Sequence, residues 1–550
     1  MQRPVRPWML GFAALAVGCA PAGPPGAAVE SITARGLQKH IAMLASDSFA
    51  GRGPSSVGEE RTLAYLQREF ASLGLRPGNG DSWHQDVPLV RSTVKAGAAL
   101  TARSGGALAR FAWGDDFVAF TKRVTEVSQL QNSELVFVGY GVVAPEYGWN
   151  DYADLDVRGK TVVMLVNDPG FATRDTALFR GRAMTYYGRW TYKFEEAARQ
   201  GAAGALIVHE TEPAAYGWDV VRNSWTGPQF NLEAGDGAVP RVAVEGWVTL
   251  QTARALFRLG GQEYDSLKGR AAQRGFRAVP LGAQVSVRLD LEIVRSMSRN
   301  FLAVLPGSDH ADEYVIYMGH WDHFGTDATR AGDQIFNGAV DNATGVAALL
   351  EVARAFTTLS SPVSRSVLFL AVTAEEQGLL GSQYYGTHPV VPLAQTVAAI
   401  NMDALNVLGR MRDITVVGLG YSELDSLVQL AAERQNRVVR PDPEPEKGYY
   451  YRSDHFSFAK QGVPALNPGS GVDHVEHGEA WTLEREAEYR DQKYHKPADE
   501  YDRSWDLSGM VEDVQLLFDV GYRLATSRAF PNWREGTEFR AARDRMMDGR

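Results

Sequence analysis

The chain contains 550 residues, of which 45% are hydrophobic and 22% are charged, and its formal net charge is -10. A chain of this length and composition predicts two or three soluble domains with cores of ordinary size. The negative charge and the lack of a nucleic-acid-binding motif in the sequence argue against nucleic acid and anionic lipid as partners.

The N-terminal residues have the pattern of an export signal. Arg3 and Arg6 precede the apolar run "WMLGFAALAVG", which stops at Cys19 and is far shorter than the ~20 residues needed to span a bilayer. Cys19 is the only cysteine, and its surroundings resemble a bacterial lipoprotein signal, although Ala16 stands where leucine is usual. We expect residues 1–28 to be a signal peptide and tether with a lipid anchor at Cys19. A plain signal peptide with an incidental cysteine is the alternative.

This signal predicts an exported protein, placed in the bacterial cell envelope as a lipoprotein or periplasmic protein, or secreted. Because no second cysteine exists, the mature chain has no internal disulfide and depends on its core or on metals for stability.

Two helical stretches follow the tether. In residues 29–86, "SITARGLQKHIAMLAS" and "GEERTLAYLQREFASLGL" place apolar side chains at helical spacing, with a loop between them. From 87 to 290 the pattern changes to short β-rich pieces such as "ELVFVGYGVVAP" and "KTVVMLVND", separated by Gly, Pro and Asp turns. We expect residues 87–290 to form a mostly β domain inserted in the chain.

Residues 291–530 alternate between strand and helix patterns. This alternation predicts an α/β fold with a mixed, largely parallel sheet and helices on both faces. Residues 531–550 are expected to form a C-terminal tail.

Polar side chains follow three of the predicted strands at the point where each strand ends. "VIYMGH" ends at His320, "SVLFLAVTAEE" at Glu375 and Glu376, and "AAINMD" at Asp403. Asp341 begins the helix pattern "DNATGVAALLEVARAF", where a capping role alone is the alternative. Sites in open α/β sheets lie beyond the carboxyl ends of the strands, so we expect these side chains to share one rim.

Imidazole and carboxylate ligands in this mixture suit zinc. Two ions would need a bridging carboxylate and about two more protein ligands each, which leaves one histidine missing from the set. Sequence spacing alone does not identify this histidine. Of the adjacent glutamates, one can bind metal while the other acts as a general base, although such a pair is common at exposed helix starts. The candidates for the missing histidine are His455, His474, His477 and His495.

The ordered motifs "GHWDHFG", "NGAVDNATG", "TAEEQGLLGS", "NMDAL" and "YHKPADEYD" resemble the M28 family of zinc metallopeptidases, which includes aminopeptidases and glutamate carboxypeptidases. The segment "FVGYGVVAPEYGWNDYADLDVRGKTVVMLVNDPG" resembles a protease-associated (PA) domain. Together these matches cover nearly the whole mature chain. The resemblance implies a zinc exopeptidase fold carrying an inserted PA-like domain.

The resemblance also implies a role for each matching residue. It makes Asp341 the bridge between two zinc ions and Glu375 the general base. Asp322 would orient the first histidine ligand, and Tyr494 would polarise the substrate carbonyl. The implied metal ligands are His320, Asp341, Glu376, Asp403 and His495.

Some neighbouring residues receive no role or depart from the pattern. The resemblance assigns nothing to His323, which we expect to be a polar loop residue. It implies a cis peptide between Asp341 and Asn342. Val340 precedes the aspartate where many relatives have a second acidic residue, and Thr344 stands where serine is usual.

The implied activity is hydrolysis of peptide bonds by a di-zinc exopeptidase, with an aminopeptidase favoured by family frequency. Glutamate carboxypeptidase-like or dipeptidase activity is the alternative on the same site. A one-zinc glutaminyl cyclase-like aminoacyltransferase and a non-catalytic binding protein are disfavoured because no ligand is missing. The M20 metallopeptidases are disfavoured because their inserted domain follows several ligands. Oligomeric state is left open.

Several other polar residues have competing interpretations. Residues 449–452, "YYYR", line a binding cleft or form a surface loop, and Arg452 hints weakly at a carboxylate pocket. We expect Asp454 and His455 to be structural, and His474 and His477 to lie at the surface.

Overall fold

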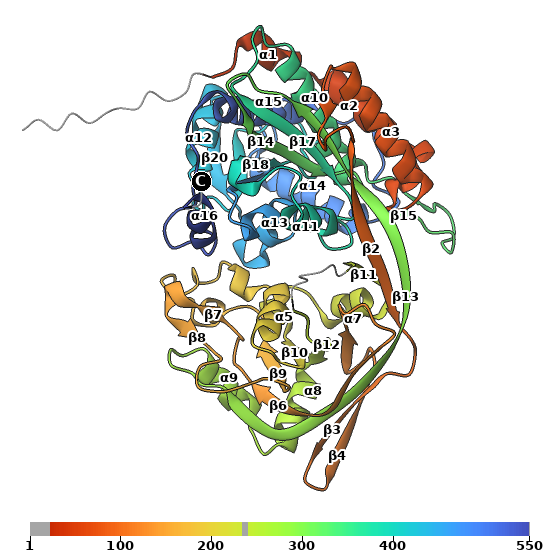
Figure 1. The fold of residues 1–550 in the computed structure, drawn as a ribbon, viewed down its shortest axis with the longest axis vertical. Helices are drawn as coiled ribbons and strands as arrows, with labels where there is room; N and C mark the ends of the chain where they lie inside the picture. The colour runs from red at the N-terminus through yellow and green to blue at the C-terminus, as the bar shows by residue number, and fades with distance from the viewer. Residues whose placement is uncertain (1–22, 234–239, 549–550) are drawn as a thin grey trace, which may run out of the picture.

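The computed structural model describes residues 23–233 and 240–548, so the expected signal peptide and Cys19 lie outside the described residues. Figure 1 shows two bodies, one above the other, joined along one side by the long strands β2 (His84–Val94) and β13 (Val279–Leu305). β13 pairs with β2 over Leu291–Phe301 and with β6 (Val127–Phe137) over Val279–Asp290. One continuous strand therefore runs through the domain boundary expected at residue 290.

The upper body contains a mixed sheet in which four neighbouring strands are parallel, which confirms the predicted α/β class. β13 and β2 extend this sheet on one side in the antiparallel sense. β19 and β20 continue it on the other side. The order across the sheet is β11 (Gln229–Leu232), β2, β13, β17 (Arg365–Val372), β14 (His310–His320), β18 (Thr396–Asn401), β21 (Ala465–Gly469), β19 (Asp413–Val417) and β20 (Val438–Pro441).

Both faces of this sheet are covered, because alternate side chains along each central strand enter different cores. On β14, Val315 and Tyr317 belong to one core, whereas Ile316 and Met318 belong to another. The first core is covered by α1 (Gly26–Ser31), α2 (Ala34–Leu44), α3 (Val57–Ser72), α10 (Thr344–Thr357), α12 (Leu424–Arg434) and α15 (Ser508–Thr526). The second is covered by α11 (Leu380–Thr387) and α13 (His455–Lys460).

The lower body has a core of its own around a smaller sheet. Its strands β6, β9 (Thr161–Leu165), β10 (Gly204–His209) and β12 (Val244–Thr249) are parallel. The prediction of a mostly β insertion anticipated only α5 (Trp190–Arg199), whereas the described residues of this body form five further α-helices, two of which are the short α4 (Pro169–Thr173) and α6 (Thr211–Ala214). Its other elements include β3 (Ala99–Ser104), β4 (Ala107–Ala112), β5 (Phe117–Phe120), β7 (Val143–Ala144), β8 (Trp149–Asn150), α7 (Trp218–Thr226), α8 (Leu250–Leu259) and α9 (Tyr264–Ala271).

The C-terminal segment expected as a tail packs onto the upper body. Trp533 is fully buried, and its indole nitrogen donates to the carbonyl of Gly462 at 2.9 Å. Arg543, on α16 (Arg540–Met547), donates to the carbonyl of Thr396 at the start of β18. Within residues 23–233 and 240–548, no helix combines the length and apolar character needed to cross a membrane.

Candidate metal centre

Two strand ends and one helix start bring three of the expected ligands together. His320 is the last residue of β14, and Asp403 follows the parallel strand β18 by two residues. Asp341 lies in the wide turn Ala339–Ala343 that leads into α10. The His320 Nε2 atom lies 3.1 Å from Asp341 Oδ1 and 3.2 Å from Asp403 Oδ1. We call these three residues the His320 half.

His495 completes a second group around the same aspartate. Its Nε2 atom lies 3.3 Å from Asp341 Oδ2 and 3.2 Å from Glu376 Oε2. Glu376 comes from the turn after β17, and His495 comes from the loop after α14 (Gly478–Gln492). We call His495, Glu376 and Asp341 the His495 half. Asp341 thus presents one carboxylate oxygen to each half.

These distances fit metal coordination. In a tetrahedral zinc site with bonds of about 2.0–2.2 Å, neighbouring ligand atoms lie ~3.3–3.6 Å apart. Each half offers one imidazole and two carboxylates with facing atoms 3.1–3.3 Å apart. The structure therefore brings together all five residues expected as metal ligands, in two sets that share one carboxylate.

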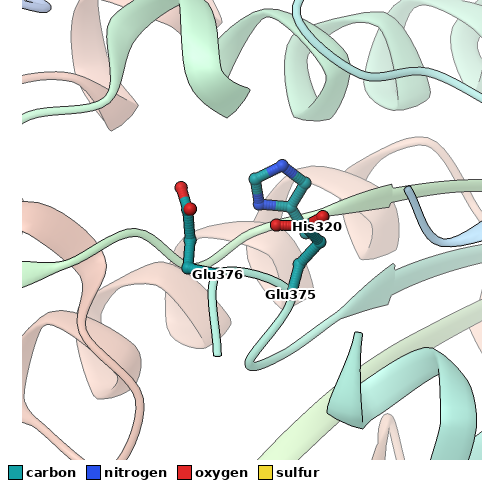
Figure 2. A group of neighbouring side chains, drawn as sticks. All are labelled: His320, Glu375 and Glu376. Atoms are coloured by element: carbon teal, nitrogen blue, oxygen red, sulfur yellow. The ribbon is translucent and has the colours of Figure 1, made fainter. Parts of the chain in front are cut away.

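Figure 2 shows His320, Glu375 and Glu376, whose ligand atoms all lie within 4.8 Å of one another. Burial, reinforced by Asp403, raises the pKa of Glu375 well above its ordinary value. Burial and the charge of Asp341 do the same to the pKa of Glu376. Without a cation, these carboxyl groups tend to keep their protons.

The pKa shifts of His320 and Asp341 favour the charged forms of these side chains, whereas the shifts of the two glutamates favour their neutral forms. Burial favours neutral His320, but Glu375 and Asp403 outweigh it and raise the pKa of the imidazole well above its ordinary value. Burial of Asp341 is likewise outweighed by hydrogen bonds with His320 and His495, which hold its pKa well below the ordinary value. The excess of buried carboxylates suits the centre to binding a cation.

Asp499, from the motif "YHKPADEYD", ties the His495 loop to the bridging aspartate. Its carboxylate accepts from the backbone N–H groups of Val340 and Asp341, each at 3.1 Å. The peptide between Asp341 and Asn342 is cis, as the resemblance implied.

Arg52 fixes the two loops that carry His320 and Asp341, a role that the sequence did not reveal. Its buried guanidinium donates to the carbonyls of Trp321, Asn337 and Gly338 at 2.6–2.9 Å. Burial lowers its pKa to about 10. The N-terminal helical segment thereby contributes directly to the geometry of the centre.

Asp322 contacts the centre in a different way from the one expected. The Nδ1 atom of His320 lies 3.1 Å from the backbone oxygen of Asp322 and 3.9 Å from its carboxylate. The carboxylate instead accepts from the backbone N–H of Glu375 at 3.1 Å. Its side chain therefore positions the turn that carries both glutamates.

Tyr494 lies beside the His495 half. Its ring stacks on the His495 imidazole with centroids 3.7 Å apart, and the residue is 42% exposed. Tyr494 therefore lies partly exposed beside the centre.

His323 lies in a loop, as expected, but it contacts a residue of the His495 half. It is fully buried, and its Nδ1 atom lies 2.5 Å from Glu376 Oε1, the oxygen that faces away from His495. Which of the two groups donates depends on the tautomer of the imidazole and on whether the Glu376 carboxyl carries its proton. Ser453 makes the matching contact in the His320 half, where its hydroxyl donates to Asp403 Oδ2 at 2.5 Å. Neither contact had a signal in the sequence beyond proximity to a ligand motif.

The other candidate histidines lie in other environments. His455 is fully buried against the Tyr450 ring at 4.6 Å. His474 stacks on His477 at 4.8 Å and is only 5% exposed, so its expected place at the surface is wrong, whereas His477 is exposed. Asp454 is fully buried, in keeping with a structural role.

The "YYYR" segment is not a surface loop over its whole length. Tyr450 and Tyr451 are buried in a cluster with Met184 of the inserted domain and with Phe456 and Trp533. Arg452 alone remains exposed. The tyrosines therefore join the two bodies of the molecule.

Residues 300–518 match the sequence model described as Peptidase family M28, so the resemblance is confirmed for the segment that carries the centre. Among curated proteins, the chain is similar to Aminopeptidase NAALADL1 from Mus musculus, with 34% identity over 129 residues. It is also similar to the Glutamate carboxypeptidase 2 homolog from Caenorhabditis elegans, with 28% identity over 201 residues.

These alignments cover only parts of the proteins. The first spans 22% of this chain and 16% of the mouse protein, and the second spans 35% of this chain and 24% of the nematode protein. Among solved structures, an aminopeptidase from Aneurinibacillus sp. strain AM-1 is 20% identical, with a TM-score of 0.49, over 91% of this chain and 96% of that one.

Proposed function

We propose that this chain, whose residues 300–518 match peptidase family M28, is a di-zinc metallo-exopeptidase that acts as an aminopeptidase. The observation that carries the proposal is the division of the Asp341 carboxylate between two histidines, with Oδ1 facing His320 and Oδ2 facing His495. One zinc ion would be held by each half. Bound zinc would make a water molecule acidic enough to attack a peptide carbonyl near neutral pH.

Glu375 is the residue suited to move the proton. It is in neither half, its carboxyl group is buried, and its raised pKa favours both taking and returning a proton. In the proposed reaction it accepts the proton of the attacking water and passes it to the leaving amine. Asp322 supports this role by holding the Glu375 backbone N–H at 3.1 Å.

The exposed Tyr494 hydroxyl would donate to the substrate carbonyl oxygen as negative charge develops there. The stacked contact of its ring with His495 holds the phenol at the entrance of the centre. A glutaminyl cyclase-like enzyme or a binding protein is less compatible with this site, because a one-zinc centre does not require a second complete half.

Action at the N-terminus of the substrate is supported by the similarity to mouse Aminopeptidase NAALADL1 and by the acidic character of the centre, which suits a free α-amino group. Carboxypeptidase-like or dipeptidase activity is the alternative on the same residues.

The test is zinc content of the purified protein together with release of N-terminal residues from peptides. Two zinc equivalents and hydrolysis that stops on chelation and returns on adding zinc are expected. Zinc binding without hydrolysis of any peptide would refute the enzyme, and release from the C-terminus alone would refute the aminopeptidase.

We further propose that the inserted body is a PA-like domain that limits access to the centre, and that the protein is exported, with Cys19 lipidated. The sequence of the N-terminal segment supports export. Metabolic labelling with a lipid precursor, lost in Cys19→Ala, tests the anchor.

A further inference from the structure

The inserted body contains a cavity of about 660 Å³ that none of the proposed metal ligands lines. The parallel strands β9, β10 and β12 all end at this cavity, and the residues that directly follow them, Val166, Glu210 and Leu250, line it. Small molecules bind beyond the carboxyl ends of strands in open parallel sheets, and their pockets commonly measure about 300–1,000 Å³. The place and the size of the cavity therefore suit a second binding site.

Much of the cavity lining is apolar and is held in place by contacts within the inserted body. Tyr140 is buried, and its carbonyl accepts from Lys193 Nζ at 2.6 Å. The indole nitrogen of Trp218 donates to the carbonyl of Gly114 at 2.9 Å, and its ring packs edge-on against His209 with centroids 5.7 Å apart. Aromatic rings fixed in this way give a preformed surface for a flat apolar ligand.

Charged side chains line the same cavity. Three of them are cationic and two are carboxylates: Arg174, Arg182, Lys268, Glu210 and Glu212. Lys268 Nζ forms an ion pair with Glu210 Oε2, and the Tyr264 hydroxyl donates to Glu210 Oε1 at 2.8 Å. These contacts occupy both oxygens of the Glu210 carboxylate and neutralise one cation, so two arginines and one carboxylate remain.

The two arginines are the cations left for a ligand. The Arg182 guanidinium lies over the Phe171 ring at 4.9 Å, and its Nη1 atom is 3.7 Å from Glu212 Oε1, which is too long for a hydrogen bond. Because both members of this ion pair are exposed to solvent, it contributes little to stability. Within residues 23–233 and 240–548, the Arg174 side chain forms neither an ion pair nor a hydrogen bond. The cavity therefore offers guanidinium donors that no protein carboxylate holds tightly.

We propose that this cavity binds a small organic anion with a flat apolar body, and that Arg174 and Arg182 pair with its anionic group. The planar guanidinium group matches a carboxylate or a phosphate with paired hydrogen bonds, so either can be the anion. The apolar body packs against the aromatic lining, to which Trp218 and Phe171 contribute. This site is separate from the metal centre and does not depend on the proposed peptidase activity.

Isothermal titration calorimetry on the zinc-loaded protein tests the site with two pairs of probes. Indole-3-acetate and indole-3-acetamide share a ring system and differ in charge, as do adenosine monophosphate and adenosine. We expect at least one anion to bind about tenfold or more tightly than its neutral partner, as charge-assisted hydrogen bonds predict. Which anion gains more identifies a carboxylate or a phosphate as the preferred group.

Arg174→Gln and Arg182→Gln should each reduce this difference to less than about threefold. Both side chains are exposed, so both variants should fold. Arg103→Gln is the matched control, because Arg103 is an exposed arginine of the same body that does not line the cavity, and it should keep the full difference.

A wild-type protein that binds neither anion more tightly than its neutral partner would overturn the site. So would a difference that survives in both Arg174→Gln and Arg182→Gln, because the zinc ions or another surface would then hold the anion. Peptide hydrolysis is assayed separately, so failure of this site leaves the proposed function intact.

Discussion

The two halves of the metal centre use the same kinds of ligand but hold them differently. His320 ends a central strand and its side chain is 1% exposed, whereas the His495 side chain lies on a loop and is 37% exposed. His495 also has a positive φ of 56°, an uncommon backbone conformation for a non-glycine residue. The sheet holds the histidine of the His320 half in place, whereas a loop supplies the histidine of the His495 half. We therefore expect the His495 half to exchange its metal more readily.

A substitution of Glu375 tests whether proton transfer can be lost while both halves still bind zinc. Glu375→Gln should lower kcat by about 10²–10⁴-fold, because a general base is lost. Zinc content should stay at the wild-type value, since Glu375 is not a member of either half. Steady-state kinetics and elemental analysis of the same sample check this, and a variant with near-normal kcat would reject the assigned base.

Replacing the histidine of one half should weaken zinc binding mainly in that half. His495→Ala should lose one zinc equivalent and weaken binding there by more than the ~10–100-fold that loss of a supporting contact costs. His320→Ala should lose a zinc and also lower the unfolding temperature, because its side chain is buried at a strand end. Competition with a zinc chelator measures the affinities, and equal effects of the two variants on stability would contradict the comparison.

The outer contacts of the two halves offer a finer test. His323→Ala removes the hydrogen-bond partner of Glu376, and Ser453→Ala removes the donor to Asp403. Each change should weaken zinc binding about 10–100-fold, the first in the His495 half and the second in the His320 half.

Replacing zinc with cobalt distinguishes a supporting contact of His323 with Glu376 from direct binding of the metal by His323. The absorption of cobalt in His323→Ala should keep the wild-type coordination number and change only slightly. A lost ligand would show that His323 binds the metal itself.

The smallest expected effect is the change of folding stability with pH in the metal-free protein. Glu375 and Glu376 have raised folded-state pKa values, so above their ordinary value of 4.5 the folded state holds more protons and stability falls as pH rises. His320 acts in the same direction, since its contribution is present below its ordinary value of 6.5 and is lost as pH rises through its raised folded pKa.

The unfolding temperature of the metal-free protein should therefore fall by about 2–4 °C from about pH 5 to about pH 8. The increment added by zinc should grow over the same range, because its ligands must be deprotonated to bind. Calorimetry with and without zinc at each pH checks both signs. A metal-free protein that gains stability with pH would show that the carboxylates are compensated in another way.

Sequence patterns identified some of the expected ligand residues of the two halves more directly than others. His320, Glu376 and Asp403 each follow a buried strand pattern, and parallel strands bring their ends to one rim, so local sequence was enough to group them. His495 follows a helix and a turn with no periodic signal, and only the family resemblance selected it among four histidines. The contacts of His323 and Ser453 could not be predicted, because loop residues meet through the packing of distant segments.

The sequence by itself determined the α/β class, the strand ends that supply metal ligands, and the match of residues 300–518 to family M28. Those features depend on hydrophobic periodicity and on short motifs, which act over a few residues. Only the tertiary structure decided that Asp341 faces both histidines and that Arg52 holds the two loops that carry His320 and Asp341. The contacts of Arg52 with Trp321 and of Asp341 with His495 join segments more than 100 residues apart, and tertiary packing alone sets their approach.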